Sequence, residues 1–412
     1  MHVRARLRID ESVSESRALR DEVRDWRARW DAIDAMGSHL TQLDLLAGVV
    51  TGLIDEVTAR LAAIDPALPA GEAYDACREQ DRRLLHARRL WRWYADKLDQ
   101  RNGPEDDARV QTLEAADEVI WSCWKTAFTV LGETVPPAPV AYLAPQFSAS
   151  ATPRSDPPDG LRPGADDLLR EHVEQLPLPV VGLPPACERR PWWLILAAHE
   201  ASHHIQFEAG QSEAGQPGAG DLEQRTQDAV TRAVGAGAAN PAEVRAWQAW
   251  CRELFADACS VLLAGPAAIW AVRELETRPA ASMTRSPSLT YPPPVVRLAV
   301  LESVANQAGI GVPRCHDDPA LGAEPDFYRT DGQLLHHVPA VATALLSLTS
   351  KPAARPLRDM AEGTVKACAP GGAIAGWRAE LTGTDEPVPR HALDAARFCA
   401  AAGVEAWQRL SA

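Results

Sequence analysis

Residues 191–208 read PWWLILAAHEASHHIQFE, an apolar run that leads directly into a cluster of histidines. The run predicts a buried helix. His199 and His203 are four residues apart, so a helix places both imidazoles on one face, where they can bind one metal ion. Glu200 lies beside the first histidine and can act as a general base toward a water at the metal without being a ligand. The stretch therefore predicts a helix that carries a metal centre.

A second apolar stretch supplies acidic residues with the same spacing. Residues 244–263 read VRAWQAWCRELFADACSVLL, and Glu253 and Asp257 share one helix face. Two carboxylates on an apolar helix are costly to bury unless a metal or a cationic ring pairs with them. Zinc hydrolases keep three protein ligands and one open position, so we predict Glu253 as the third ligand beside His199 and His203. We expect Asp257 to accept the second ring N–H of a ligand histidine and so fix its tautomer.

The two stretches together resemble the gluzincin metallopeptidases, whose hallmark is His-Glu-x-x-His followed by a helix with Glu-x-x-Ala-Asp. The resemblance covers roughly residues 175–300 and includes SLTYPPPVVRL at 288–298. This segment is similar to the Thr-His-Pro-Pro…Arg segment of minimal gluzincins of the CAAX-protease-like type, with Tyr291 where they carry a histidine. The resemblance implies a zincin-like domain with a small sheet upstream of the active-site helix, bound Zn²⁺, and peptide-bond hydrolysis with Glu200 as general base.

Tyr291 is our candidate for stabilising the oxyanion that forms when water attacks a carbonyl group. The prolines at 292–294 stiffen the chain just after it, and a phenol can donate a hydrogen bond as an imidazole does. Arg297, His336 and His337 are the alternatives for this role.

Other residues of metal-binding or reactive type have simpler interpretations. His204 points to a different face of the helix from His203, so we expect a supporting or surface position for it. Cys251 and Cys259 flank the two acids and are expected to pack as small apolar residues. His391 is expected to be an ordinary surface or core histidine.

Residues 10–132 are predicted to form helices ahead of the metal-binding stretches. Apolar residues within 40–64 alternate spacings of three and four, which is a heptad seam. Further helices are expected at about 72–98 and 105–131. The same seam pattern occurs one segment earlier, at Leu19, Val23, Trp26, Trp30 and Ile33. We predict a helical amino-terminal domain, residues 1–134, whose seams pack with one another, with a helical partner or with a second copy.

The proline-rich segment 135–164 is predicted to be a linker or a set of short strands. Residues 140–143 and 180–182 are the strand candidates nearby, and their flanking prolines are typical of edge strands. The glycine-rich residues 209–221 are expected to form a surface loop. Residues 135–412 are therefore predicted as a metallopeptidase domain with a small sheet and a C-terminal helical extension. The expected fold class is mainly α (α+β).

The composition of the 412 residues is that of a globular protein, with 46% hydrophobic and 24% charged residues. The formal net charge of −14 argues against a nucleic-acid partner. No apolar run approaches the ~18 residues of a membrane span. The eight cysteines form no Cys-x-x-Cys pair, and no secretory signal is visible at the start. We therefore expect a cytoplasmic protein.

Three functions are consistent with these patterns. The first is a zinc metallopeptidase that hydrolyses peptide or protein substrates. The second is a zinc-dependent tailoring enzyme that acts on one specific peptide or small molecule, and it predicts the same zinc ligands. The third is a non-catalytic helical interaction protein with a structural zinc. Glu200 argues against the third function, because a structural site needs no base.

Overall fold

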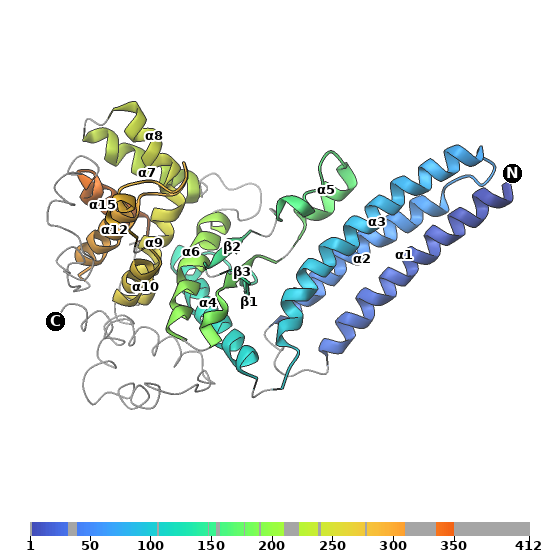
Figure 1. Ribbon diagram of the computed structural model, residues 1–412, viewed down its shortest axis with the longest axis horizontal. Helices are drawn as coiled ribbons and strands as arrows, with labels where there is room; N and C mark the ends of the chain where they lie inside the picture. Colours follow the sequence, from blue (N-terminus) through green and yellow to red (C-terminus); the bar gives the residue numbers. More distant parts are fainter. Residues whose placement is uncertain are drawn as a thin grey trace. The chain divides into compact units, whose positions relative to one another are not determined.

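The computed structural model is mainly helical with one three-stranded sheet, which confirms the predicted fold class (Figure 1). None of the helices described is both long and apolar enough to cross a membrane. His391, most of the glycine-rich stretch and the chain beyond residue 349 lie outside the described residues. Those residues are 2–31, 39–104, 107–146, 148–153, 157–176, 178–188, 191–209, 222–237, 240–276, 278–309 and 335–349.

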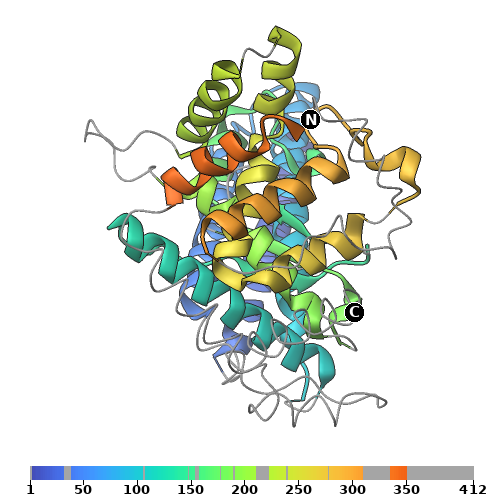
Figure 2. The same cartoon turned by 90° about the vertical axis from the view of Figure 1, so that its left-hand side faces the viewer.

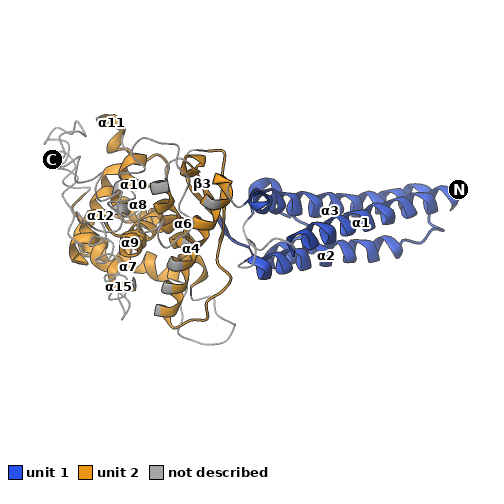
Figure 3. Ribbon diagram, turned by 90° about the horizontal axis from the view of Figure 1, so that it is seen from below, with its two compact units in different colours: residues 1–105, 152–180 blue, residues 106–151, 181–412 orange. Residues whose placement is uncertain are grey.

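The chain divides into two compact units, each built from two segments of sequence (Figure 3). Unit 1 comprises residues 1–105 and 152–180, and unit 2 comprises residues 106–151 and 181–412. This division differs from the one expected at residue 134. The helix before that residue belongs to unit 2, and a segment after it returns to unit 1.

Unit 1 is built on three long helices that lie side by side, α1 (His2–Trp30), α2 (Leu40–Ala62) and α3 (Ala70–Leu98). The predicted seams lie in its core, so they pack with one another within the chain. Each large apolar side chain buried in this way contributes roughly 1.5–3 kcal/mol to folding. The buried seam residues are Leu19, Val23, Trp26, Trp30, Leu43, Val50, Ile54, Val57 and Leu61.

Helix α5 (Asp167–Glu174) completes unit 1 by packing on α2. Asp166 caps this helix by accepting a hydrogen bond from the Leu169 backbone N–H at 3.2 Å. The same carboxylate accepts a hydrogen bond of 2.8 Å from Arg83 of α3. The Tyr94 hydroxyl donates to the backbone carbonyl of Leu178 at 3.4 Å. These contacts join the second segment of unit 1 to helices α2 and α3.

Helix α4 (Ala108–Leu131) belongs to unit 2 because its apolar face packs against helix α6 (Leu196–Glu208) and strand β1 (Val140–Leu143). Trp124 and Phe128 are buried there in the same core as residues of α6 and α9, and the Trp124 indole N–H donates to the Pro136 carbonyl at 2.8 Å. Asp107 caps the start of the helix, and Gly132 ends it with a φ of 73°, a conformation that favours glycine. The sequence placed α4 correctly but assigned it to the wrong unit.

The sheet has the strand order β1-β3-β2, with β1 (Val140–Leu143), β2 (Ser150–Thr152) and β3 (Val180–Leu183). Both strand predictions are confirmed, but β3 is the central strand and not an edge strand. Its prolines lie outside the strand, so they remove none of its backbone donors. A Cβ at Gly182 would lie 2.6 Å from Ser150 Oγ and 3.0 Å from the Tyr142 hydroxyl, so a larger residue here would displace these two side chains of the neighbouring strands.

The other elements described in unit 2 are helices. Helices α6 and α9 pack on each other, α9 also contacts α10 and α12, and α12 lies beside α15 (Figure 2). A short 3-10 helix, Pro191–Ile195, leads into α6. The packing of α6 on α9 brings the two metal-binding motifs together. The helices are α6 (Leu196–Glu208), α7 (Leu222–Ala236), α8 (Pro241–Ala249), α9 (Cys251–Ala264), α10 (Pro266–Glu276), α11 (Ala280–Met283), α12 (Pro294–Gln307) and α15 (Val338–Thr349).

Candidate metal centre

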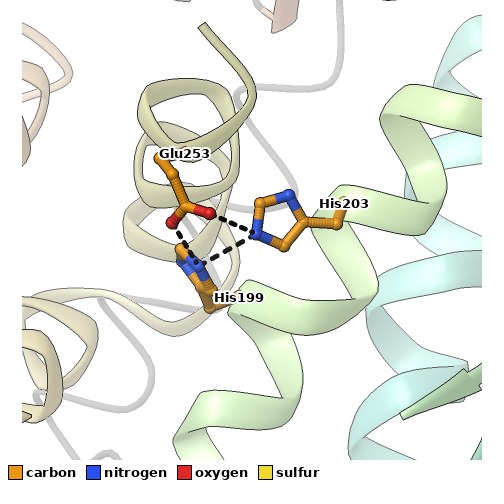
Figure 4. A group of neighbouring side chains, drawn as sticks. All are labelled: His199, His203 and Glu253. Carbon is orange, nitrogen blue, oxygen red and sulfur yellow. Dashed lines mark hydrogen bonds and ion pairs between the residues drawn. The ribbon is translucent and has the colours of Figure 1, made fainter. Parts of the chain in front are cut away.

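Three predicted ligands converge between α6 and α9 (Figure 4). The Nε2 atoms of His199 and His203 lie 3.2 Å apart. The Glu253 carboxylate oxygens lie 3.5 Å from Nε2 of His199 and 3.6 Å from Nε2 of His203. Within the described chain, this is the group of side chains whose donor atoms are close enough to hold a metal ion, all within 4.8 Å of one another.

Small side chains are buried on both helices. Ala197, Ala198 and Ala201 of α6 are fully buried, as are Ala256 and Ala258 of α9. Alanine has a high helix propensity, which favours regular helices here. The ligands therefore project from rigid backbone and not from a loop.

Asp257 lies on the other side of the His199 ring from the cluster. Its Oδ1 is 3.1 Å from His199 Nδ1, and its side chain is completely buried. Arg297 of α12 holds both carboxylate oxygens, with Nε donating to Oδ2 at 2.8 Å and Nη2 donating to Oδ1 at 2.7 Å. The predicted position of Asp257 next to a ligand histidine matches this geometry, and the bidentate arginine fixes the plane of its carboxylate.

Tyr291 reaches the same region from the turn before α12. Its hydroxyl donates to Glu276 Oε1 at 2.6 Å and also contacts Arg297, whose guanidinium lies 4.8 Å from the centre of the tyrosine ring. A phenol has one proton to donate, and in this structure that proton goes to Glu276. The predicted role of Tyr291 at an oxyanion stays a prediction.

Glu200, the predicted general base, is buried with 7% of its surface exposed. Burial raises the pKa of its carboxyl to about 7; the charge of His199 lowers this pKa, and the charge of Glu253 raises it further. A carboxyl group with a pKa near neutrality can both accept and return a proton at physiological pH.

Two of the three ligands are in the ionisation state that metal binding needs. Burial alone would lower the pKa of His199, but the neighbouring carboxylates of Asp257 and Glu253 raise it to about 10, so this imidazole must release a proton when it binds a metal. Burial lowers the pKa of His203 to about 4, so its imidazole is neutral at pH 7. Burial alone would raise the pKa of Glu253, but the hydrogen bond with His199 and the charges of His203 and Arg297 hold it below its ordinary value. A neutral imidazole and an ionised carboxylate are the forms that bind a cation.

The other histidines and cysteines named from the sequence do not belong to this cluster. His204 is fully buried, while His336 is exposed. His337 packs against Trp247, with ring centres 6.2 Å apart. Cys251 and Cys259 are buried free thiols, as expected.

Sequence reasoning missed Glu276, which is 2% exposed and bonded to both Arg297 and Tyr291. A signal for it was present in α10. Ile269, Val272 and Glu276 have the spacing i, i+3, i+7, which places the acid on the buried stripe of the helix. An acid on such a stripe indicates a buried partner.

A scan of protein-family models, a search of curated proteins and a search of solved structures each gave no match. The function of this centre is therefore argued from its own residues.

Proposed function

We propose that this protein is a zinc metallopeptidase, a hydrolase of peptide bonds in peptide or protein substrates. The observation that carries the proposal is the convergence of His199, His203 and Glu253 with Glu200 buried one residue from the first ligand. Two imidazoles, one carboxylate and a nearby base are the groups that zinc hydrolases use.

The spacing of the donors supports zinc in particular. In a tetrahedral zinc site, bond lengths of ~2.0–2.1 Å place neighbouring ligand atoms about 3.3–3.5 Å apart. The corresponding separations here are 3.2, 3.5 and 3.6 Å. The donors therefore need little rearrangement to enclose this ion.

The balance of buried charge also supports a divalent cation. Asp257 and Glu276 share the guanidinium of Arg297, and Glu253 lies 3.8 Å from the same group. Three carboxylates thus surround the buried guanidinium of Arg297. Without a metal, the raised pKa of His199 supplies a second buried positive charge, and the partly exposed Arg278 pairs with Glu276. Burying excess negative charge is costly unless a cation compensates it.

The chain's own residues account for proton transfer. Zinc, when held by His199, His203 and Glu253, supplies a Lewis acid that polarises the scissile carbonyl and acidifies water. Glu200 takes the proton from the attacking water and passes it to the leaving nitrogen. Asp257 holds the ring of His199 in place through Nδ1.

A purely structural zinc is less well supported. Structural sites enclose the ion with four protein ligands, whereas the described residues bring three together here. The remaining coordination position and the buried base favour catalysis.

We also propose that the protein acts in a reducing compartment such as the cytoplasm. Its five described cysteines, at positions 77, 123, 187, 251 and 259, are all free thiols. Free buried thiols are typical of proteins from reducing compartments.

The proposal is tested by Glu200→Gln, assayed by mass spectrometry of products from a broad peptide library. We expect the variant to keep one zinc per chain and to lose hydrolysis by about three powers of ten or more. Glu208→Gln, which changes another buried glutamate of α6, is the matched control and should keep activity. Parent-like turnover by Glu200→Gln would reject the peptidase mechanism.

The ligand set has a separate test. Glu253→Ala should lower the zinc content of purified protein, measured by elemental analysis, from about one per chain to nearly none, because one of three ligands is lost. The control Glu223→Ala removes a glutamate that instead pairs with Arg252 on the protein surface. Full zinc content in Glu253→Ala would show that the ligands are different.

A further inference from the structure

Glu276 ends α10 and lies at the centre of a buried hydrogen-bond network. Its Oε1 accepts hydrogen bonds from the Tyr291 hydroxyl at 2.6 Å and from Arg297 Nη1 at 2.7 Å. Its Oε2 lies 3.3 Å from Arg278 Nη2. With 2% of its surface exposed, this carboxylate exchanges its hydration for these fixed donors, so its orientation is defined by them.

Arg297 is held at both ends by carboxylates. Nε and Nη2 grip Asp257, and Nη1 is bonded to Glu276. A guanidinium is planar, so a second anchor on Nη1 prevents it from pivoting about its bond with Asp257. Glu276 therefore determines the plane in which Arg297 meets Asp257.

The network continues to the metal ligand. The Asp257 oxygen that accepts from Arg297 Nη2 is the oxygen 3.1 Å from His199 Nδ1. The orientation of a carboxylate beside Nδ1 sets the direction of the opposite ring nitrogen, which binds the metal. A change at Glu276 should thus be transmitted through two side chains to Nε2 of His199.

We propose that Glu276 is a positioning residue of the metal centre, which orients His199 through Arg297 and Asp257. The inference rests on the metal centre of the proposed function, and it adds a residue from a third helix to that centre. Its effect is on zinc affinity and coordination geometry, since Glu276 has no bond with His199, His203 or Glu253 in the described network.

The first test is Glu276→Met, which keeps the length of the side chain and removes both acceptors. We expect the zinc dissociation constant of the full-length protein, measured by competition with a chromogenic chelator, to rise about 10-fold or more. Glu276→Gln should stay near the parent value, because its amide oxygen can still accept from Arg297 and Tyr291. The visible spectrum of the Co²⁺-loaded Met variant should differ from that of the parent, because the ligand field reports the orientation of His199.

Glu302→Met is the matched control. Glu302 is a buried glutamate on the same helix as Arg297, but it lines the groove between α12 and α15. The Glu302→Met variant should be less stable than the parent but should keep the parent's zinc affinity and Co²⁺ spectrum. A folded Glu276→Met protein with parent-like zinc affinity and spectrum would overturn the inference and leave Glu276 a structural salt-bridge residue.

A double-mutant cycle tests the route of the effect. In an Asp257→Asn background, Glu276→Met should add less than about twofold to the loss of affinity, because residues that act through one chain of contacts are not additive. If the loss of zinc affinity in the double variant equals the product of the losses in the two single variants, Glu276 does not act through Asp257.

Arg297→Lys covers the case in which Glu276→Met does not fold. An ammonium cannot hold two carboxylates in one plane, so we expect a similar 10-fold loss of zinc affinity, and parent-like affinity would overturn the inference. If the parent protein binds no zinc, the proposed function is rejected. If the parent and the variant bind zinc equally well, only the inference about Glu276 is rejected.

Discussion

At the scale of single residues, the two ring nitrogens of His199 have different surroundings. Nε2 faces His203 and Glu253, and Nδ1 faces Asp257. The neighbouring carboxylates raise the pKa of His199 to about 10. The carboxylate next to Nδ1 keeps a proton on that nitrogen, so the proton on Nε2 is the one that leaves when a metal binds. The protein therefore specifies the binding atom before a metal arrives.

Tyr291→Phe tests the role of a single hydroxyl group. Because this hydroxyl donates its proton to Glu276, we expect kcat to fall less than about tenfold, whereas the loss of an oxyanion donor costs about a hundredfold or more. The measurement is kcat and KM on a peptide cleaved by the parent. Tyr142→Phe, whose hydroxyl interacts with Ser150 in the sheet, is the control.

A hundredfold fall in kcat at unchanged KM and unchanged zinc affinity would contradict this expectation. It would mean that the Tyr291 hydroxyl leaves Glu276 during the reaction and donates to the substrate oxygen, as the sequence suggests.

At the scale of helices and strands, local sequence patterns predicted most of the elements. The heptad seams of α1 and α2 and the two valine-containing strands were read correctly, because their periodicity depends on neighbours a few residues away. The i, i+4 pairs on α6 and α9 also placed the three ligands and Asp257 on the correct faces.

The features that could not be predicted from the sequence depend on contacts between residues far apart in the chain. Nothing within α4 indicates that Trp124 and Phe128 pack in unit 2, since an amphipathic helix suits either unit. The hydrogen bond between Arg297 and Glu276 joins α12 to α10, and the two residues are 21 positions apart in the chain. The central position of β3 likewise depends on which strands flank it.

Lys97 of helix α3 predicts that the stability of the protein depends on pH. The half-buried Lys97 amine lies 3.5 Å from the centre of the Trp93 ring, and burial lowers its pKa from 10.5 to about 8. Between pH 8 and 10.5 the unfolded state binds more protons at this lysine than the folded state does, so its contribution to stability rises with pH. Relative to Lys97→Met, the parent's free energy of unfolding should increase across this window by about 1 kcal/mol after allowance for solvent screening.

Urea denaturation of both proteins at several pH values measures this difference. Lys125→Met, which changes an exposed lysine, is the control and should show the same pH profile as the parent. A constant difference between parent and Lys97→Met from pH 7 to 11 would show that the folded and unfolded states titrate alike at this lysine.

At the scale of the whole molecule, the interleaved segments decide which truncations are tolerated. Deletion of residues 1–134 removes α4 and takes Trp124 and Phe128 out of the unit 2 core. The loss of one buried aromatic side chain costs about 3–5 kcal/mol, and total stabilities are about 5–15 kcal/mol. We therefore expect this deletion to abolish folding and zinc binding.

A chain that starts at residue 106 and replaces residues 154–178 with a short flexible linker is the matched comparison. It keeps α4, the three strands and all ligand-bearing helices, so it should bind about one zinc with parent-like affinity. Circular dichroism and zinc analysis of both truncations provide the measurement. Zinc binding by the first truncation, or none by the second, would mean that the units do not correspond to independent folding units.

The interleaving of the two units also sets an order of events on the ribosome. Helices α1 to α3 leave the exit tunnel first, but unit 1 is complete only when α5 has followed. Until then α4 has been synthesised with β1 but without α6, so the part of its apolar face that packs on α6 is uncovered within the nascent chain, a situation in which chaperones commonly engage. His199 and Glu253 are translated last of all these parts. The proposed metal could therefore bind only late in the synthesis of this protein, after the amino-terminal helices have been able to assemble.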